Sequence, residues 1–317
     1  MTFPLMHGYD HINVVADLDP VAAVRDRELG ERIRDYPKLL PAGSPDFGYA
    51  VQDGTRWRIV CAGETDPSTA RYGLAFRLRE RAQEDPANAP AMLAAAGRLD
   101  PEEGEQLAKD EWEIGDRRYR IIRIEKFTLI GGGAMEPPRA TDGSRGDADS
   151  LIDRLIDPLA PAGLWEAQLR LNLVGHMPIP GTVPEMIQME ARHAIRAHPG
   201  VILLPPTFTM VEVHDGSYEP LTGGDDPVQA RGNLAHYFTR LLPRLREFQG
   251  DPAGPDELKS WAMAGAEIEA ADGPEFSTLG RTFRTVRISR MLRLGRDGPE
   301  SPRPSDQERY GVAGMSG

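Results

Sequence analysis

The sequence predicts an α+β protein made of two tandem homologous domains, each a mostly antiparallel sheet with helices packed on it. Two observations support this fold class. Residues 117–142 match residues 281–306 without a gap at a spacing of 164, and nine of the 26 aligned positions are identical. The pattern Asp-Pro-x-x-Ala-Arg-x-x-Leu also occurs twice, starting at Asp66 and at Asp226. Self-similarity at a fixed spacing is the sequence signature of an internal repeat.

The elements of the first half follow from helix-capping residues and turn dipeptides. Asp19-Pro20 supplies an N-cap followed by a proline in the first turn, and it predicts a helix that ends near Asp35. Asp53-Gly54 suits the tight turn of a β-hairpin. The other expected elements are a short strand at 12–18, hairpin strands at 47–52 and 55–61, helices at 66–85 and 89–99, and a strand pair at 112–130.

The second half repeats most of these signals. Apolar and polar residues alternate from Trp165 to Leu173, which predicts a strand with one polar face. The sequence from Thr182 to Glu185 resembles a capping box and predicts a helix that ends near Ala197. Further expected elements are hairpin strands at 207–213 and 217–221 around Asp215-Gly216, helical segments at 226–250 and 255–271, and a final arginine-rich strand pair.

The repeat also predicts the domain organisation. A chain of 317 residues is long enough for two domains that each bury a core. The expected parts are a first repeat domain at 1–142, a linker at 143–163, a second repeat domain at 164–306 and a flexible tail at 307–317.

Composition excludes several classes of partner. A net charge of −12 argues against general affinity for nucleic acid or anionic lipid, because both need a basic surface. No run approaches the ~18 apolar residues that a membrane span requires, and the start of the sequence does not resemble a secretory signal. The lone cysteine, Cys61, allows no internal disulfide. We therefore expect a cytoplasmic protein that binds neither membrane nor nucleic acid.

A family resemblance rests on three segments. They are the Gly-Arg-x-Phe-Arg-x-Val-Arg-Ile stretch at 280–288, the Gly-x-Asp-Gly-Pro-Glu-x-Pro-Arg-Pro-Ser-Asp tail at 295–306, and the Asp-Pro motif at 226–234. With these segments the chain resembles an actinobacterial domain-of-unknown-function family (five-nine-five-four) over nearly its whole length. The first copy departs from this pattern at 132–135, where Gly-Gly-Ala-Met replaces the Asp-Gly-Pro type of turn. The resemblance implies no activity, substrate or catalytic residue.

The search for catalytic and metal-binding motifs is negative. The glycine-rich stretch at 131–136 lacks the last glycine of a dinucleotide fingerprint and precedes prolines rather than a helix. Cys61 has no nucleophile signature, so a small, buried apolar role is favoured over a reactive thiol. His7, Asp10 and His11 could share a metal only if the terminal segment folded back on itself, and His193 and His198 are five residues apart at a helix end. Surface histidines are the favoured interpretation of both groups. We expect no catalytic residue, no metal and no cofactor.

Four arginines form the one candidate ligand-binding set. Arg120 and Arg123 point to opposite faces of the first arginine-rich strand, and Arg284 and Arg287 repeat them in the second. Four guanidinium groups of this kind could hold a carboxylate or phosphate ligand. Alternatively, they pair with carboxylates of the chain itself, such as those at 136, 142, 300 and 306. We favour the second interpretation.

Two classes of function follow. In the first, the protein is a non-catalytic interaction or regulatory protein, in which the duplicated domains form an internal pseudo-dimer that presents an acidic surface to an unknown protein partner. In the second, it binds or acts on a small anionic metabolite in the cleft between the two repeats, with the four arginines as ligands. The negative motif search favours the first class and a protein that is not an enzyme.

Overall fold

A computed structural model of the chain describes residues 12–100, 109–143 and 150–306. Several expectations lie outside these residues: the flexible tail at 307–317, the linker residues 144–149, and the group of His7, Asp10 and His11. None of the described helices combines the length and the apolar composition that a membrane crossing needs.

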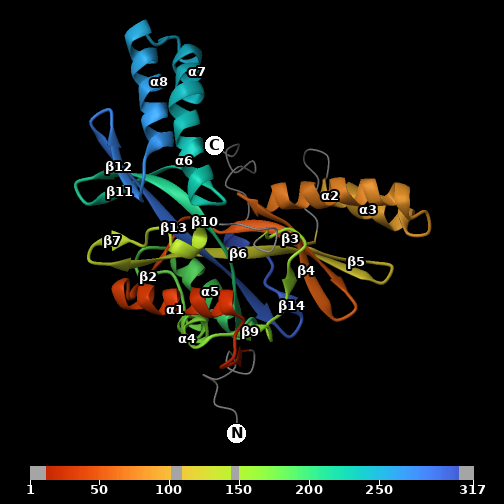
Figure 1. Cartoon of the computed structure of the whole chain (residues 1–317). Helices are drawn as coiled ribbons and strands as arrows, with labels where there is room; N and C mark the ends of the chain where they lie inside the picture. The colour runs from red at the N-terminus through yellow and green to blue at the C-terminus, as the bar shows by residue number, and fades with distance from the viewer. Residues whose placement is uncertain (1–11, 101–108, 144–149, 307–317) are drawn as a thin grey trace.

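One large sheet runs through both halves of the molecule, as Figure 1 shows. Its 12 strands include a central path in the order β11-β10-β13-β6-β3-β4-β8, and every pairing in it is antiparallel. The path strands are β3 (Asp46–Asp53), β4 (Arg56–Glu64), β6 (Arg117–Gly131), β8 (Leu155–Ile156), β10 (Gly200–His214), β11 (Ser217–Gly224) and β13 (Arg281–Gly295). Five short strands pair with β6 or β13: β2 (Lys38–Pro41), β5 (Glu111–Ile114), β7 (Ala134–Met135), β12 (Glu275–Thr278) and β14 (Gly298–Pro299). The α+β class is confirmed.

The two halves meet where β6 pairs with β13. Lys126 lies opposite Arg290 in this pair, and these two positions are 164 residues apart, the spacing of the sequence match. On either side of this pair Phe127 faces Ser289 and Glu125 faces Met291, so the pairing is symmetric about Lys126 and Arg290 and has a local twofold symmetry. Both halves contribute to this one sheet, whereas the sequence predicted a separate sheet in each.

Three of the helices, α1, α2 and α6, begin at the capping residues that the sequence indicated. The Asp19 carboxylate accepts hydrogen bonds from the N–H groups of Val21 and Ala22, and Asp66 and Asp226 cap the starts of α2 and α6 in the same way. The helices are α1 (Pro20–Asp35), α2 (Pro67–Glu84), α3 (Ala89–Leu99), α4 (Leu164–Val174), α5 (Glu185–Ala197), α6 (Pro227–His236), the π-helix η5 (Tyr237–Leu241), α7 (Leu242–Phe248) and α8 (Pro255–Ala270).

The strand predicted at 165–173 is wrong, because these residues lie in helix α4. Alternation at a period of two also places Trp165, Leu169 and Leu173 at helical spacing, so the pattern fits either element. Leucine and alanine favour the helix, and the stretch holds no β-branched residue. A tertiary contact completes the helix start, because the Asp26 carboxylate of α1 accepts the N–H groups of Trp165 and Glu166.

The capping box predicted before α5 is also wrong. Pro184 is the N-cap and makes no side-chain cap, while the Thr182 hydroxyl donates to the Ile179 carbonyl oxygen at 2.7 Å. The short strand expected at 12–18 shrinks to β1 (Asn13–Val14), which pairs in parallel with β9 (Pro161–Ala162). The predicted linker interval contains β9 and β8, and its boundaries stay a prediction.

Two helical arms extend from the sheet in different directions, as Figure 1 shows. We define arm 1 as α2 with α3, and arm 2 as α6, η5, α7 and α8. A core cluster of buried residues that includes Leu74, Leu78 and Tyr119 joins arm 1 to the sheet, and a second cluster that includes Phe238, Ile268 and Phe283 joins arm 2 to it. Of the other helices, α1 and α4 pack on the central strands.

Candidate functional site

Two of the four predicted arginines make equivalent ion pairs within their own segments. Arg120 donates from Nε to the Glu111 carboxylate at 2.7 Å, and Arg284 donates from Nε to Glu275 at 2.8 Å. Both partners are nine residues before their arginine, on β5 and β12. Arg120 also contacts the other half, because its Nη1 donates to the Pro299 carbonyl oxygen at 3.0 Å.

The other two predicted arginines pair across the two halves. Arg123 donates from Nε to Asp306 at 2.7 Å, and Arg287 donates from Nε to Asp142 at 3.0 Å. We call residues 136–142 tail 1 and residues 300–306 tail 2. Each tail follows its own arginine-rich strand and then contacts the arginine of the other strand. The two tails are thus exchanged between the halves.

Backbone contacts follow the same exchange. The Arg123 N–H donates to the carbonyl oxygen of Glu300 in tail 2 at 3.0 Å, and the Arg287 N–H donates to that of Glu136 in tail 1 at 2.8 Å. Within the tails, Nε of Arg139 donates to Glu136 at 2.6 Å, and Nε of Arg303 donates to Glu300 at 2.7 Å. These intramolecular pairs are the kind that the sequence analysis favoured for the arginines.

Two helices hold the tails through carboxylates that the sequence analysis missed. Glu28 of α1 accepts the Ala140 N–H of tail 1 at 2.7 Å, and Glu190 of α5 accepts the Ser305 N–H of tail 2 at 3.3 Å. Hydrogen bonds from tail 1 hold the pKa of Glu28 below its usual value, against the opposing effect of its burial. Nothing in the local sequence of either helix indicates these contacts, since each partner is more than 100 residues away.

Glu125 lies at the centre of the arginine network. Its carboxylate accepts hydrogen bonds from Arg123 and Arg303, both at 2.6 Å, and Arg293 lies at 3.7 Å. Burial alone would raise the pKa of Glu125, but the positive charges of Arg293, Arg123 and Arg303 lower it to about 2. The group is therefore an ionised carboxylate held by three guanidinium groups, and it stabilises the exchanged tails.

Two clefts adjoin the predicted arginines. The larger, of about 600 Å³, lies between α5 and tail 2 and is lined by Arg120 together with Glu111, Glu190, His193, His198 and Pro302. The smaller, of about 320 Å³, lies between α1, tail 1 and the start of α4, and Arg287 lines it. Arg123 and Arg284 line neither of these clefts. The structure therefore separates the four predicted ligands instead of gathering them at one place.

Two candidate groups for metal or thiol chemistry are the side chains around Glu212 and the thiol of Cys61. In the described part of the chain, the one group of three candidate ligands within 4.8 Å of one another is Glu212, His214 and Glu219. Glu212 is already paired with Arg281, whose Nε donates to it at 2.7 Å. Burial, with the nearby Glu64 carboxylate, raises the pKa of Cys61 to about 11, so this thiol stays protonated at neutral pH.

Arm 2 carries an exposed apolar face that the sequence analysis did not single out. Leu241 at the end of η5 and Leu245 and Phe248 of α7 lie on one side of this continuous helix and are 48%, 40% and 91% exposed. Arg240 and Arg244 are exposed beside them, and neither has an ion pair among the described residues. By contrast, Arg246 on the same helix pairs with Asp251 at 2.6 Å. The apolar spacing of four and three residues was the sequence signal for this face.

The fold and the arginine network define an α+β protein whose two halves share one antiparallel sheet and exchange their tails. The chain belongs to a family of unknown function, DUF5954, which matches residues 19–309. This agrees with the resemblance drawn from the three sequence segments. Comparison with curated proteins and with solved structures finds no match.

Proposed function

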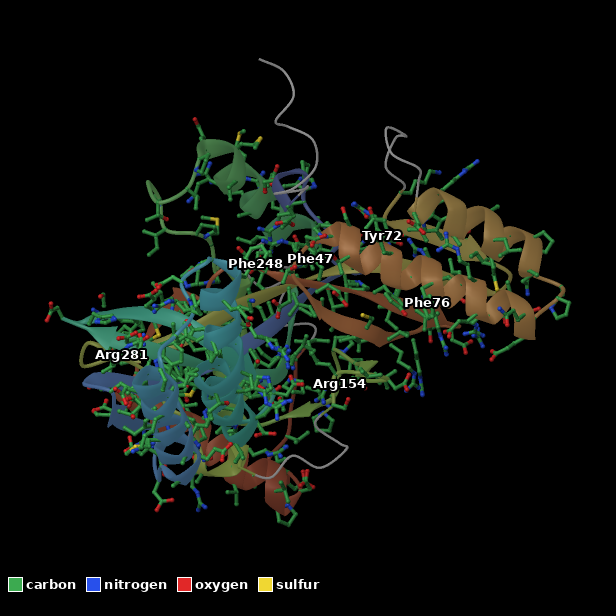
Figure 2. All side chains as sticks on the ribbon, turned by 90° about the horizontal axis from the view of Figure 1, so that it is seen from above. Phe47, Tyr72, Phe76, Arg154, Phe248 and Arg281 are labelled. Atoms are coloured by element: carbon green, nitrogen blue, oxygen red, sulfur yellow. The ribbon has the colours of Figure 1, made fainter. Side chains whose placement is uncertain are left out.

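We propose that this protein is a non-catalytic interaction protein and that α7 is its docking face for an acidic, amphipathic segment of another protein. The observation that carries this proposal is Phe248, which is 91% exposed at the end of α7, in line with Leu241 and Leu245. Figure 2 looks down on the arms and labels Phe248 on arm 2, with Tyr72 and Phe76 on arm 1. Exposed apolar groups gathered on one face mark interaction sites more often than single exposed residues do.

Charge selects the chemistry of the partner. Arg240 and Arg244 flank the apolar face of α7 without ion pairs in the described structure, while the chain as a whole carries a net charge of −12. A partner helix with apolar residues at i, i+4 and i+7 and carboxylates beside them would bury the face and neutralise both arginines. A second copy would bring like charges together if this face met itself, which disfavours self-association through it.

The π-helix η5 supports a special role for this face. It lies between α6 and α7, and the extra residue in its turn rotates every later side chain of α7 about the helix axis. Helix α8 packs closely against η5 at Gly265. A larger residue would not fit there, because its Cβ would lie 2.5 Å from the Thr239 methyl group of η5. π-Helical turns inside α-helices are rare and occur frequently at functional sites.

A random-peptide display selection against the purified full chain tests this function. We expect the enriched peptides to be acidic and amphipathic, and the Phe248→Ser variant to bind them with a loss of about 2 kcal/mol, as for an interface hot spot. Arg244→Glu should weaken binding and reduce its salt dependence. Phe76→Ser, which changes an exposed aromatic residue of arm 1, is the matched control and should bind like the wild type.

Three results would contradict the proposal. These are the absence of enriched peptides, enrichment of basic peptides, and peptide binding that Phe248→Ser leaves unchanged. A dimer of the chain that Phe248→Ser dissociates would instead identify a second copy as the occupant. The cytoplasm is the compartment that we propose, and the single Cys61 is compatible with its reducing conditions.

A further inference from the structure

The smaller cleft brings two buried guanidinium groups together from the two matching segments. Arg139 of tail 1 is 9% exposed and Arg287 of β13 is 11% exposed, and both line the cleft of about 320 Å³. Arg287 belongs to the predicted ligand set, and Arg139 does not. The exchange of the tails is what places them side by side, since Asp142 of tail 1 pairs with Arg287.

Both guanidinium groups have N–H donors without a hydrogen-bond partner among the described residues. Arg139 uses Nε for Glu136, and its two terminal nitrogens have no partner among the described residues. Arg287 uses Nε for Asp142 and Nη1 for the Ser289 hydroxyl at 2.6 Å, which leaves Nη2. None of these remaining nitrogens is among the polar atoms sealed from solvent without a partner. These nitrogens therefore keep some contact with solvent, and both residues line the cleft.

The two positive charges are close enough to oppose each other. Burial lowers the pKa of the Arg287 guanidinium, and the charge of Arg139 lowers it further, while Asp142 and Glu136 act in the opposite direction. An anion between the two groups would accept the free donors and relieve this repulsion.

The rest of the lining restricts the anion. Charged side chains of the cleft balance formally, with Arg25, Arg139, Arg154 and Arg287 against Asp19, Asp26, Asp142 and Glu166. Arg25 and Arg154 have interactions of their own, Asp19 caps α1, and Asp26 caps α4. A single negative charge is therefore matched better than the double charge of a phosphate. Apolar groups complete the wall: Val21, Leu29, Leu203, Leu204, Pro205 and Phe208.

We propose that this cleft binds a small monocarboxylate with a short apolar body, whose carboxylate lies between Arg139 and Arg287. Its volume is at the lower end of the range for small-molecule sites, which excludes nucleotides and other large ligands. The bound ligand bridges tail 1 to β13 and so strengthens the contact between the two halves.

Isothermal titration calorimetry and thermal unfolding at pH 7 test the site with three probes. Hexanoate has the proposed chemistry, hexanol has the same body without the charge, and inorganic phosphate has the charge without the body. We expect hexanoate to bind saturably and to raise Tm, with the other two probes weaker by about tenfold or more, which corresponds to about 1.4 kcal/mol.

Two variants locate the site by different means. Arg139→Gln removes the donors and should weaken hexanoate binding by about tenfold or more. Ala22→Phe fills the cleft from α1 without changing any charge, and it should also abolish binding while the protein stays folded. Arg284→Gln is the matched control, because Arg284 lines neither cleft, and it should bind hexanoate like the wild type.

Each alternative result overturns part of the proposal. Absence of saturable hexanoate binding to the wild type removes the site. Tighter binding of phosphate, or equal binding of hexanol, refutes the monocarboxylate class. Unchanged hexanoate affinity in both Arg139→Gln and Ala22→Phe places the binding elsewhere on the molecule.

Discussion

Burial distinguishes arginines that the sequence presents as equivalent. Arg123 is 10% exposed and pairs with Asp306, which is 8% exposed. Arg284 is 23% exposed, and its partner Glu275 is 47% exposed. Removing one member of a buried pair leaves an uncompensated charge, whereas an exposed pair contributes little. Sequence periodicity identified all four arginines as interruptions of apolar faces, but it could not rank them, because their partners come from distant parts of the chain.

The carboxylate of Glu125 gives the clearest test at the scale of single residues. Because its folded-state pKa is lowered from 4.5 to about 2, its contribution to stability is complete above 4.5 and is lost as pH falls through about 2. Glu125→Gln should lower the free energy of unfolding at pH 7 by on the order of 3 kcal/mol. The difference from the wild type should then shrink as the pH falls from 5 to 2.

Urea denaturation at several pH values measures this difference directly. Glu31→Gln is the control, because Glu31 is exposed and has no ion pair in the described structure, and it should stay within about 0.5 kcal/mol of the wild type. A wild-type-to-variant gap for Glu125→Gln that stays constant down to pH 2 would refute the network around this carboxylate.

Among the secondary-structure elements, local sequence signals were sufficient where the capping residue is a close neighbour of the helix start in the sequence. Asp19 and Asp66 cap helices whose first residues are their own neighbours, so α1 and α2 begin where the sequence predicted. Helix α4 was mistaken for a strand because Asp26, which caps it, is on another helix. The face of α7 was visible as an apolar stripe, but its exposure depends on how η5 rotates the helix.

The start of α4 should depend on this remote cap. Asp26→Ala removes the acceptor for the N–H groups of Trp165 and Glu166, and it should lower the free energy of unfolding by about 1 to 2 kcal/mol. Asp26→Asn keeps a capping oxygen and should recover most of this loss. Chemical denaturation of both variants gives the comparison, and equal stability of alanine and asparagine at this position would show that the cap is unimportant.

At the scale of the whole molecule, the exchange of tails could not be predicted. The ungapped match indicated which residues recur, and the internal duplication it implies stays a prediction that the repeated contacts support. It did not indicate that Arg123 contacts tail 2 while Arg287 contacts tail 1. A sequence repeat is equally compatible with tails that return to their own half. For the same reason the candidate cleft was predicted only in general terms, between the repeats, and Arg139 was missed.

The shared sheet and the exchanged tails predict that the two halves unfold together. β6 and β13 pair directly, and the contacts of Arg123 and Arg287 each link one half to the other, so opening either half exposes buried groups of both. Independent tandem domains would instead melt in two steps.

We expect calorimetry to give one transition with equal calorimetric and van't Hoff enthalpies. Fluorescence provides a second measurement, since Trp112 packs on the core cluster of the first half and Trp261 on that of the second. Two resolved transitions, or tryptophan variants of the two halves that melt at different denaturant concentrations, would show that the halves are separate folding units despite their common sheet.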